Sequence, residues 1–147
     1  MVILLKKGVT AMPDFFIYLL MLCLGGFGYG ALELLWRGYT HWSMVITGGI
    51  CLCAMYAIDN RTNFKLWQKA AAGAAVITTA EFAVGCVVNL RLGLNVWDYA
   101  ELPFNLLGQI SAVYSLLWLA MSFVCVFITG EIDKNLTKRK LYGGDRP

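Results

Sequence analysis

The stretch LPFNLLGQISAVYSLLWLAMSFVCVFITG, residues 102–130, contains no Asp, Glu, Lys or Arg. A helix rises about 1.5 Å per residue and the hydrocarbon core of a bilayer is about 30 Å thick, so about 20 apolar residues make one crossing. This run therefore predicts a transmembrane helix. Three more such stretches precede it, and the whole chain is 59% hydrophobic and only 14% charged.

Together these stretches predict an all-α, polytopic membrane protein, built as one four-helix transmembrane bundle within residues 1–130. We expect spans at about 15–36, 42–58, 70–90 and 106–129, followed by a basic, disordered cytoplasmic tail at 131–147. The 147 residues leave no room for a separate soluble domain, and no G-x-x-x-x-G-K-[ST] nucleotide-binding motif occurs. Any energy coupling would have to come from another chain or from an ion gradient.

The basic residues predict the orientation. If alternate loops are assigned to one side, ten of the twelve basic residues fall together, and only Arg37 and Arg91 fall on the other side. Cytoplasmic loops carry the excess of Lys and Arg, so we expect both termini in the cytoplasm. The ten are Lys6, Lys7, Arg61, Lys65, Lys69, Lys134, Lys138, Arg139, Lys140 and Arg146.

Two acids, Glu33 and Glu81, lie inside the predicted spans. A charged side chain near the centre of a membrane helix costs about 2.5–3.5 kcal/mol on insertion scales, so such residues are functional candidates by default. Glu33 can pair with Arg37 one helical turn away, which would be a purely structural arrangement. Glu81 has no basic residue within two turns in sequence. Either it is protonated, or it finds a partner from another helix, with Arg37 and His41 as the nearest candidates.

Small residues predict how the helices pack, because membrane helices associate through close van der Waals contact at such residues. Gly26 and Gly30 share a face with Glu33 and Arg37, and on the third span Glu81 shares a face with three small residues. We expect both faces to point into the bundle. In one possible arrangement, the small-residue face of the first span contacts that of the third span. The three small residues are Ala70, Ala74 and Gly85.

Further polar and aromatic residues cluster at the outer ends of the spans, and from topology alone we expect them to converge on an outward-opening pocket for a solute or ion. An ordinary role remains open for several of them: Trp97 and Tyr99 as interfacial aromatic residues, and His41 as a helix cap. The predicted pocket residues are Glu33, Arg37, His41, Glu81, Asn89, Trp97, Asp98, Tyr99, Asn105 and Gln109.

No catalytic residue, metal site or cofactor is predicted. The single histidine and the scattered Ser and Thr residues form no nucleophile motif, and we interpret the five cysteines as small packing residues.

Three elements of the sequence carry a resemblance to a known family: ELLWRGYTHWSM from Glu33 with Gly48-Gly49, the EFxxGxxxN element from Glu81, and VWDY from Val96 followed by PFNLLGQI from Pro103. They resemble a family of small bacterial membrane proteins labelled "putative ABC-transporter type IV", or CmpB-like permeases. The resemblance covers about residues 15–130. It implies a four-helix inner-membrane protein with a transport role and carries no catalytic assignment.

The leading hypothesis is a small transport or solute-binding protein of the inner membrane, with Glu81 as a group that responds to protons or cations. Its expected partners are the lipid bilayer, an unidentified small solute or ion, and further copies of itself or a partner subunit, but not nucleic acid. The alternatives are a membrane enzyme acting on lipid or a lipid-linked substrate, with Glu81, His41 or Asp98 as acid or base, and a holin-like pore former.

Overall fold

The computed structural model describes residues 14–142, and side chains within residues 15–135. The order of elements is α1 (Asp14–Arg37), α2 (Trp42–Arg61), α3 (Leu66–Gly85), a π-helical turn η1 (Cys86–Arg91) and α4 (Ala112–Tyr142). Four helices are long and apolar enough to cross a membrane, and no strand occurs within the described range. The predicted fold class is therefore confirmed.

The helix bounds differ from the predicted spans at several places, and the second helix ends at Arg61 rather than 58. The third helix begins at Leu66 and closes in the η1 turn. The fourth begins at Ala112 rather than 106, because Leu107 (φ 52°) and Gly108 (φ 67°) have left-handed backbone that no α-helix contains. It then continues to Tyr142, so the expectation of a disordered tail is wrong for residues 131–142. Residues 143–147 of that tail, and Lys6 and Lys7, lie outside the described residues.

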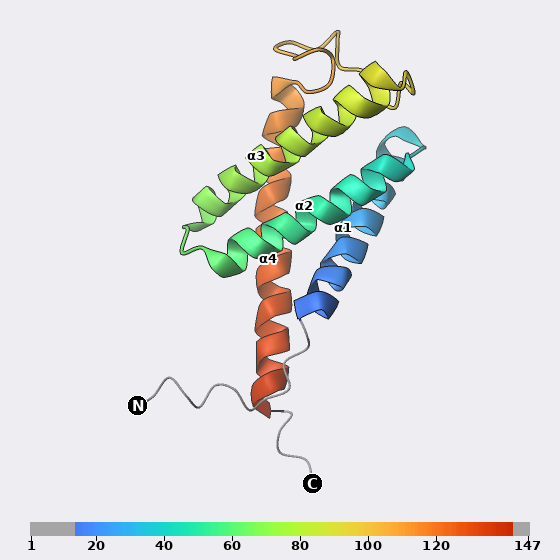
Figure 1. The fold of residues 1–147 in the computed structure, drawn as a ribbon. Helices are drawn as coiled ribbons and strands as arrows, with labels where there is room; N and C mark the ends of the chain where they lie inside the picture. The colour runs from blue at the N-terminus through green and yellow to red at the C-terminus, as the bar shows by residue number, and fades with distance from the viewer. Residues whose placement is uncertain (1–13, 143–147) are drawn as a thin grey trace.

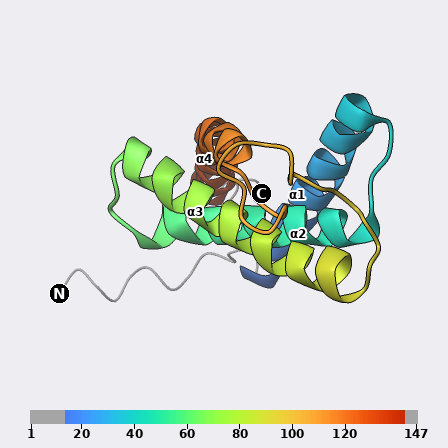
Figure 2. The same cartoon turned by 90° about the horizontal axis from the view of Figure 1, so that it is seen from above.

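Figure 1 shows α4 standing upright with α2 and α3 running obliquely across it. Helix α1 packs mainly against α2, whereas α3 packs against α4 and α2. The connections 38–41 and 92–111 lie at the same end of the bundle, where the Arg37 Nη1 donates to the Val96 carbonyl at 3.0 Å. Seen from above in Figure 2, α1 crosses α2 obliquely, and its later turns lie on the same side of α2 as α4.

Glycines bring α1 and α2 together. A Cβ atom on Gly25 would lie 2.5 Å from the Gly48 carbonyl oxygen, and one on Gly49 would lie 2.5 Å from the Leu22 carbonyl oxygen. Gly26 and Gly30 of the predicted stripe are buried against Val45 of α2. The stripe therefore faces α2, and the arrangement in which it meets the small residues of α3 is wrong.

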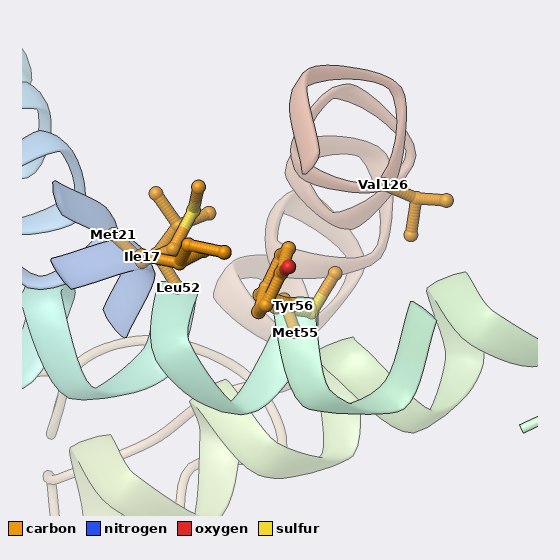
Figure 3. Close-up of a cluster of buried hydrophobic side chains, with 6 residues drawn as sticks. All are labelled: Ile17, Met21, Leu52, Met55, Tyr56 and Val126. Carbon is orange, nitrogen blue, oxygen red and sulfur yellow. The ribbon is translucent and has the colours of Figure 1, made fainter. Parts of the chain in front are cut away.

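The small residues of α3 contact other elements. Ala70 is fully buried, and a Cβ on Gly85 would meet the Gln109 side chain at 2.6 Å, whereas Ala74 is half-buried. At the end of the bundle away from the 38–41 and 92–111 connections, buried apolar residues of α1, α2 and α4 form a core cluster. Figure 3 shows its members: Ile17, Met21, Leu52, Met55, Tyr56 and Val126.

Candidate functional site

Glu81 lies on α3 with only 2% of its surface exposed, and two neutral donors from distant parts of the chain bind its carboxyl group. The Tyr99 hydroxyl donates to Oε1 at 2.9 Å, and the Trp118 indole N–H donates to Oε2 at 2.7 Å. Each carboxylate oxygen can accept about two hydrogen bonds, so one lone pair on each oxygen remains free of these donors. The expectation that Arg37 or His41 would be the partner of Glu81 is wrong.

Aromatic rings surround this carboxyl group. Tyr99 stacks on Tyr114 with ring centroids 4.2 Å apart, and Trp118 lies against Tyr29 of α1 with centroids 5.9 Å apart. Burial first, and the charge of Glu81 second, raise the pKa of the Tyr99 phenol well above its ordinary value. The phenol therefore remains a hydrogen-bond donor to Glu81 across the physiological pH range.

A cavity of about 380 Å³ adjoins Glu81. Residues of α1, α2 and α4 line it, and Glu81 and Ile77 contribute from α3. Among the described residues that line it, Glu81 is the only one with a formal charge, and most of the others are apolar. We call this space the Glu81 cleft.

The lining of the Glu81 cleft reaches the outer surface of the bundle on α1 and α4. Residues at its sides are substantially exposed on the outer surface of the bundle, including Leu24 and Leu32 of α1 and Val124 and Ile128 of α4. Such apolar exposure on a membrane-spanning helix is a surface for acyl chains. A ligand could therefore reach the cleft from within the bilayer.

Glu33 belongs to a separate polar group, at the end of the bundle that carries the 38–41 connection. It is buried, with 8% of its surface exposed, and accepts hydrogen bonds from the Arg37 guanidinium and the Thr40 hydroxyl. The same guanidinium donates to the Val96 carbonyl and lies 4.7 Å from the centre of the Tyr39 ring. Glu33 is thus paired and does not line the Glu81 cleft.

Asn89, Trp97 and Gln109 form a third group, which braces the 92–111 connection. The Asn89 amide donates to Gln109 Oε1 at 2.8 Å and accepts from the Val96 N–H at 2.7 Å. The Trp97 indole donates to the Gln109 carbonyl at 2.9 Å. All three side chains are buried, and this bracing holds the segment that carries Tyr99 to Glu81.

The remaining predicted residues organise local backbone. His41 is the N-cap of α2, with Nδ1 2.7 Å from the Ser43 hydroxyl. Asp98 accepts from the Ala100 N–H at 2.8 Å, and the Asn105 amide donates to the Ala100 and Leu102 carbonyls at 2.9 Å. Asp98 and Asn105 are both exposed. No hydrogen bond in the described part of the chain joins His41 or Asp98 to Glu81.

Metal-ligating residues are not grouped within residues 14–142: no three of His, Cys, Asp and Glu lie together there as a metal ion would need. The cysteines Cys23, Cys51, Cys53, Cys86 and Cys125 are all free thiols. Cys51 and Cys125 line the Glu81 cleft as small, soft side chains.

The sequence matches the model of a protein family described as "Putative ABC-transporter type IV" over residues 14–141, nearly the whole described chain. The chain belongs to this family. No curated protein and no solved structure matches it significantly. The predicted resemblance is confirmed, and the family together with the four apolar helices makes this ABC-transporter type IV family member a multi-pass membrane protein with a transport-related role.

In this family member the ten predicted pocket residues separate into the groups described above, and only Glu81 among them lines the cleft. The residues that sequence reasoning missed are Trp118, Tyr114 and Tyr29. One signal could have found Trp118: an indole in the middle of a span, away from the interfaces where Trp usually lies, needs a partner for its N–H.

Proposed function

We propose that this protein binds and transports a small solute or ion, and that Glu81 is the group at its binding centre that takes up either a proton or a cation. The observation that carries the proposal is an apolar cleft with lipid-exposed side chains in its lining and one carboxyl group in its wall, held by Tyr99 and Trp118. An unpaired charge in hydrocarbon is costly, so a proton or a cationic ligand would neutralise the carboxylate there.

Glu81 is distinguished from Glu33 by its partners. Glu33 has a guanidinium beside it, so its charge is already compensated. Glu81 has two neutral donors, which orient the carboxyl group without cancelling its charge. A group of this kind can couple proton release to ligand binding, because both compete for the same oxygens.

We propose that both termini face the cytoplasm, so that the end of the bundle that carries residues 38–41 and 92–111 faces outward. One copy offers a cleft lined mainly by apolar side chains rather than a polar path across the membrane. The protein would therefore work with further copies of itself or with a partner subunit.

A hydrophobic carbodiimide tests this role, because such reagents modify protonated carboxyl groups within apolar surroundings. The purified protein in detergent is treated with dicyclohexylcarbodiimide across a pH series and mapped by peptide mass spectrometry. We expect modification of Glu81 but not of Glu33, with less modification as the pH rises. Absence of label on Glu81 at every pH would refute the proposal, and Glu81→Gln controls for the assignment of the labelled peptide.

A further inference from the structure

The chemistry of the Glu81 cleft restricts the ligand. Its sides are apolar, with Leu24 and Leu32 on α1 and Val124 and Ile128 on α4, so a ligand must present hydrocarbon over most of its surface. Glu81 is the only formal charge in the described lining. An ionised Glu81 would repel an anionic ligand and neutralise a cationic one, whereas a neutral hydrocarbon would make no use of the carboxyl group.

The lining also contains aromatic rings, whose faces attract a cation. The rings of Tyr29 and Trp118 both border the cleft, and aromatic faces stabilise a nearby cation by about 0.5–2 kcal/mol. The volume of about 380 Å³ lies within the usual range of sites for drug-sized ligands, about 300–1,000 Å³. It greatly exceeds what a bare metal ion occupies.

We propose that the Glu81 cleft binds a lipophilic organic cation, with the charge beside the Glu81 carboxylate and the ring faces, and the hydrocarbon between α1 and α4. This inference rests on the proposed function and names the substrate class of the same site. When the cation enters, the protonated carboxyl group loses its proton to solvent and the carboxylate neutralises the cation, so charge is conserved in the exchange. Because lining side chains on α1 and α4 are exposed to the bilayer, such a cation would enter the cleft directly from the lipid.

Two ions of the same shape and opposite charge test the proposal. Titration calorimetry measures binding of tetraphenylphosphonium and of tetraphenylborate to the purified protein in detergent. We expect the phosphonium to bind and the borate not to bind. Equal or tighter binding of the borate would overturn the proposal, since the site would then select hydrocarbon without regard to charge.

Variants locate the site. Glu81→Gln removes the charge, and we expect affinity for tetraphenylphosphonium to fall by about tenfold or more. Gly28→Leu tests the cleft without touching Glu81: Gly28 lines the cleft, and a Cβ there meets no heavy atom within 4 Å, so the larger side chain starts in open space and is expected to occupy part of the cleft. We expect it to abolish binding. Ala31→Leu is the matched control, on an exposed position of the same helix outside the lining.

Unchanged tetraphenylphosphonium binding in both Glu81→Gln and Gly28→Leu would overturn the inference. The carbodiimide and binding experiments together distinguish a failure of this inference from a failure of the proposed function. If the carbodiimide labels Glu81 but tetraphenylphosphonium neither binds nor protects against labelling, the substrate class is wrong and the proton-binding role stands. If Glu81 is not labelled, the proposed function itself fails.

Discussion

Trp118 and Glu81 are 37 positions apart in sequence, yet the Trp118 indole N–H donates to the Glu81 carboxyl group at 2.7 Å. This bond joins α4 to α3 inside the apolar region. It also fixes which way the carboxyl group faces in the cleft. The protein thus uses a neutral donor where a basic residue would have cancelled the charge.

Replacing Trp118 by Phe should destabilise the protein by about 1–3 kcal/mol, because it leaves a buried carboxyl oxygen without its donor while keeping an aromatic ring. Thermal unfolding in detergent measures the change. Trp67 provides the control, since it is 62% exposed and Trp67→Phe should leave the unfolding temperature unchanged. Equal effects of the two substitutions would contradict the assigned bond.

The contact between α1 and α2 predicts a contrast between two glycines. Gly48→Ala would place its Cβ 2.5 Å from the Tyr29 Cβ, so the helices must separate, at a cost of about 1–3 kcal/mol. Gly28→Ala introduces a methyl group with no heavy atom within 4 Å and should be neutral or slightly stabilising. Thermal unfolding of both variants decides whether α1 packs on α2 as described.

Tyr99 makes stability depend on pH in the alkaline range. Its pKa is raised in the folded protein above the ordinary value of 10.0, so the folded state holds the phenolic proton more tightly than the unfolded state does. The contribution is fully present below pH 10 and is lost as the pH rises beyond it. Tyr99→Phe should flatten the loss of stability above pH 10, as measured by chemical unfolding. An unchanged pH profile would contradict the burial of the Tyr99 phenol beside Glu81.

The bracing of residues 92–111 predicts a local change in dynamics. Asn89→Ala removes the acceptor for the Val96 N–H and the donor to Gln109, so amide hydrogen exchange in this segment should accelerate while exchange in α1 and α2 stays slow. Asn63, exposed in the connection between α2 and α3, is the matched control position. Faster exchange after Asn63→Ala as well would mean that the effect is not specific to the brace.

The four spans were predictable because a bilayer requires long charge-free stretches, and residues such as those in 102–130 have no other common use. The late start of α4 was not predictable from apolarity. Residues 106–111 carry no charge and continue the run up to Gly130, but the left-handed backbone at Leu107 and Gly108 turns the chain first. Hydropathy reports burial in lipid and carries no information on backbone conformation.

The candidate site was predictable only at Glu81, since a lone intramembrane acid is conspicuous against an apolar helix. Its partners were not predictable, because Tyr99 and Trp118 are brought to it by the crossing of α3 and α4. Asn89 and Gln109 were expected to line a pocket, but their amides are complementary and bind each other instead. A polar residue in an apolar span is expected to form a hydrogen bond, but the sequence alone does not show with which residue.

On the proposed mechanism, Glu81 holds a proton before the ligand binds and gives it up to a cation. Infrared difference spectroscopy of wild-type protein minus Glu81→Gln measures this directly, through the carbonyl stretch of a protonated carboxyl group. We expect that band at neutral pH and its loss when tetraphenylphosphonium is added. Identical wild-type and Glu81→Gln spectra in this region, at acidic and neutral pH alike, would contradict it.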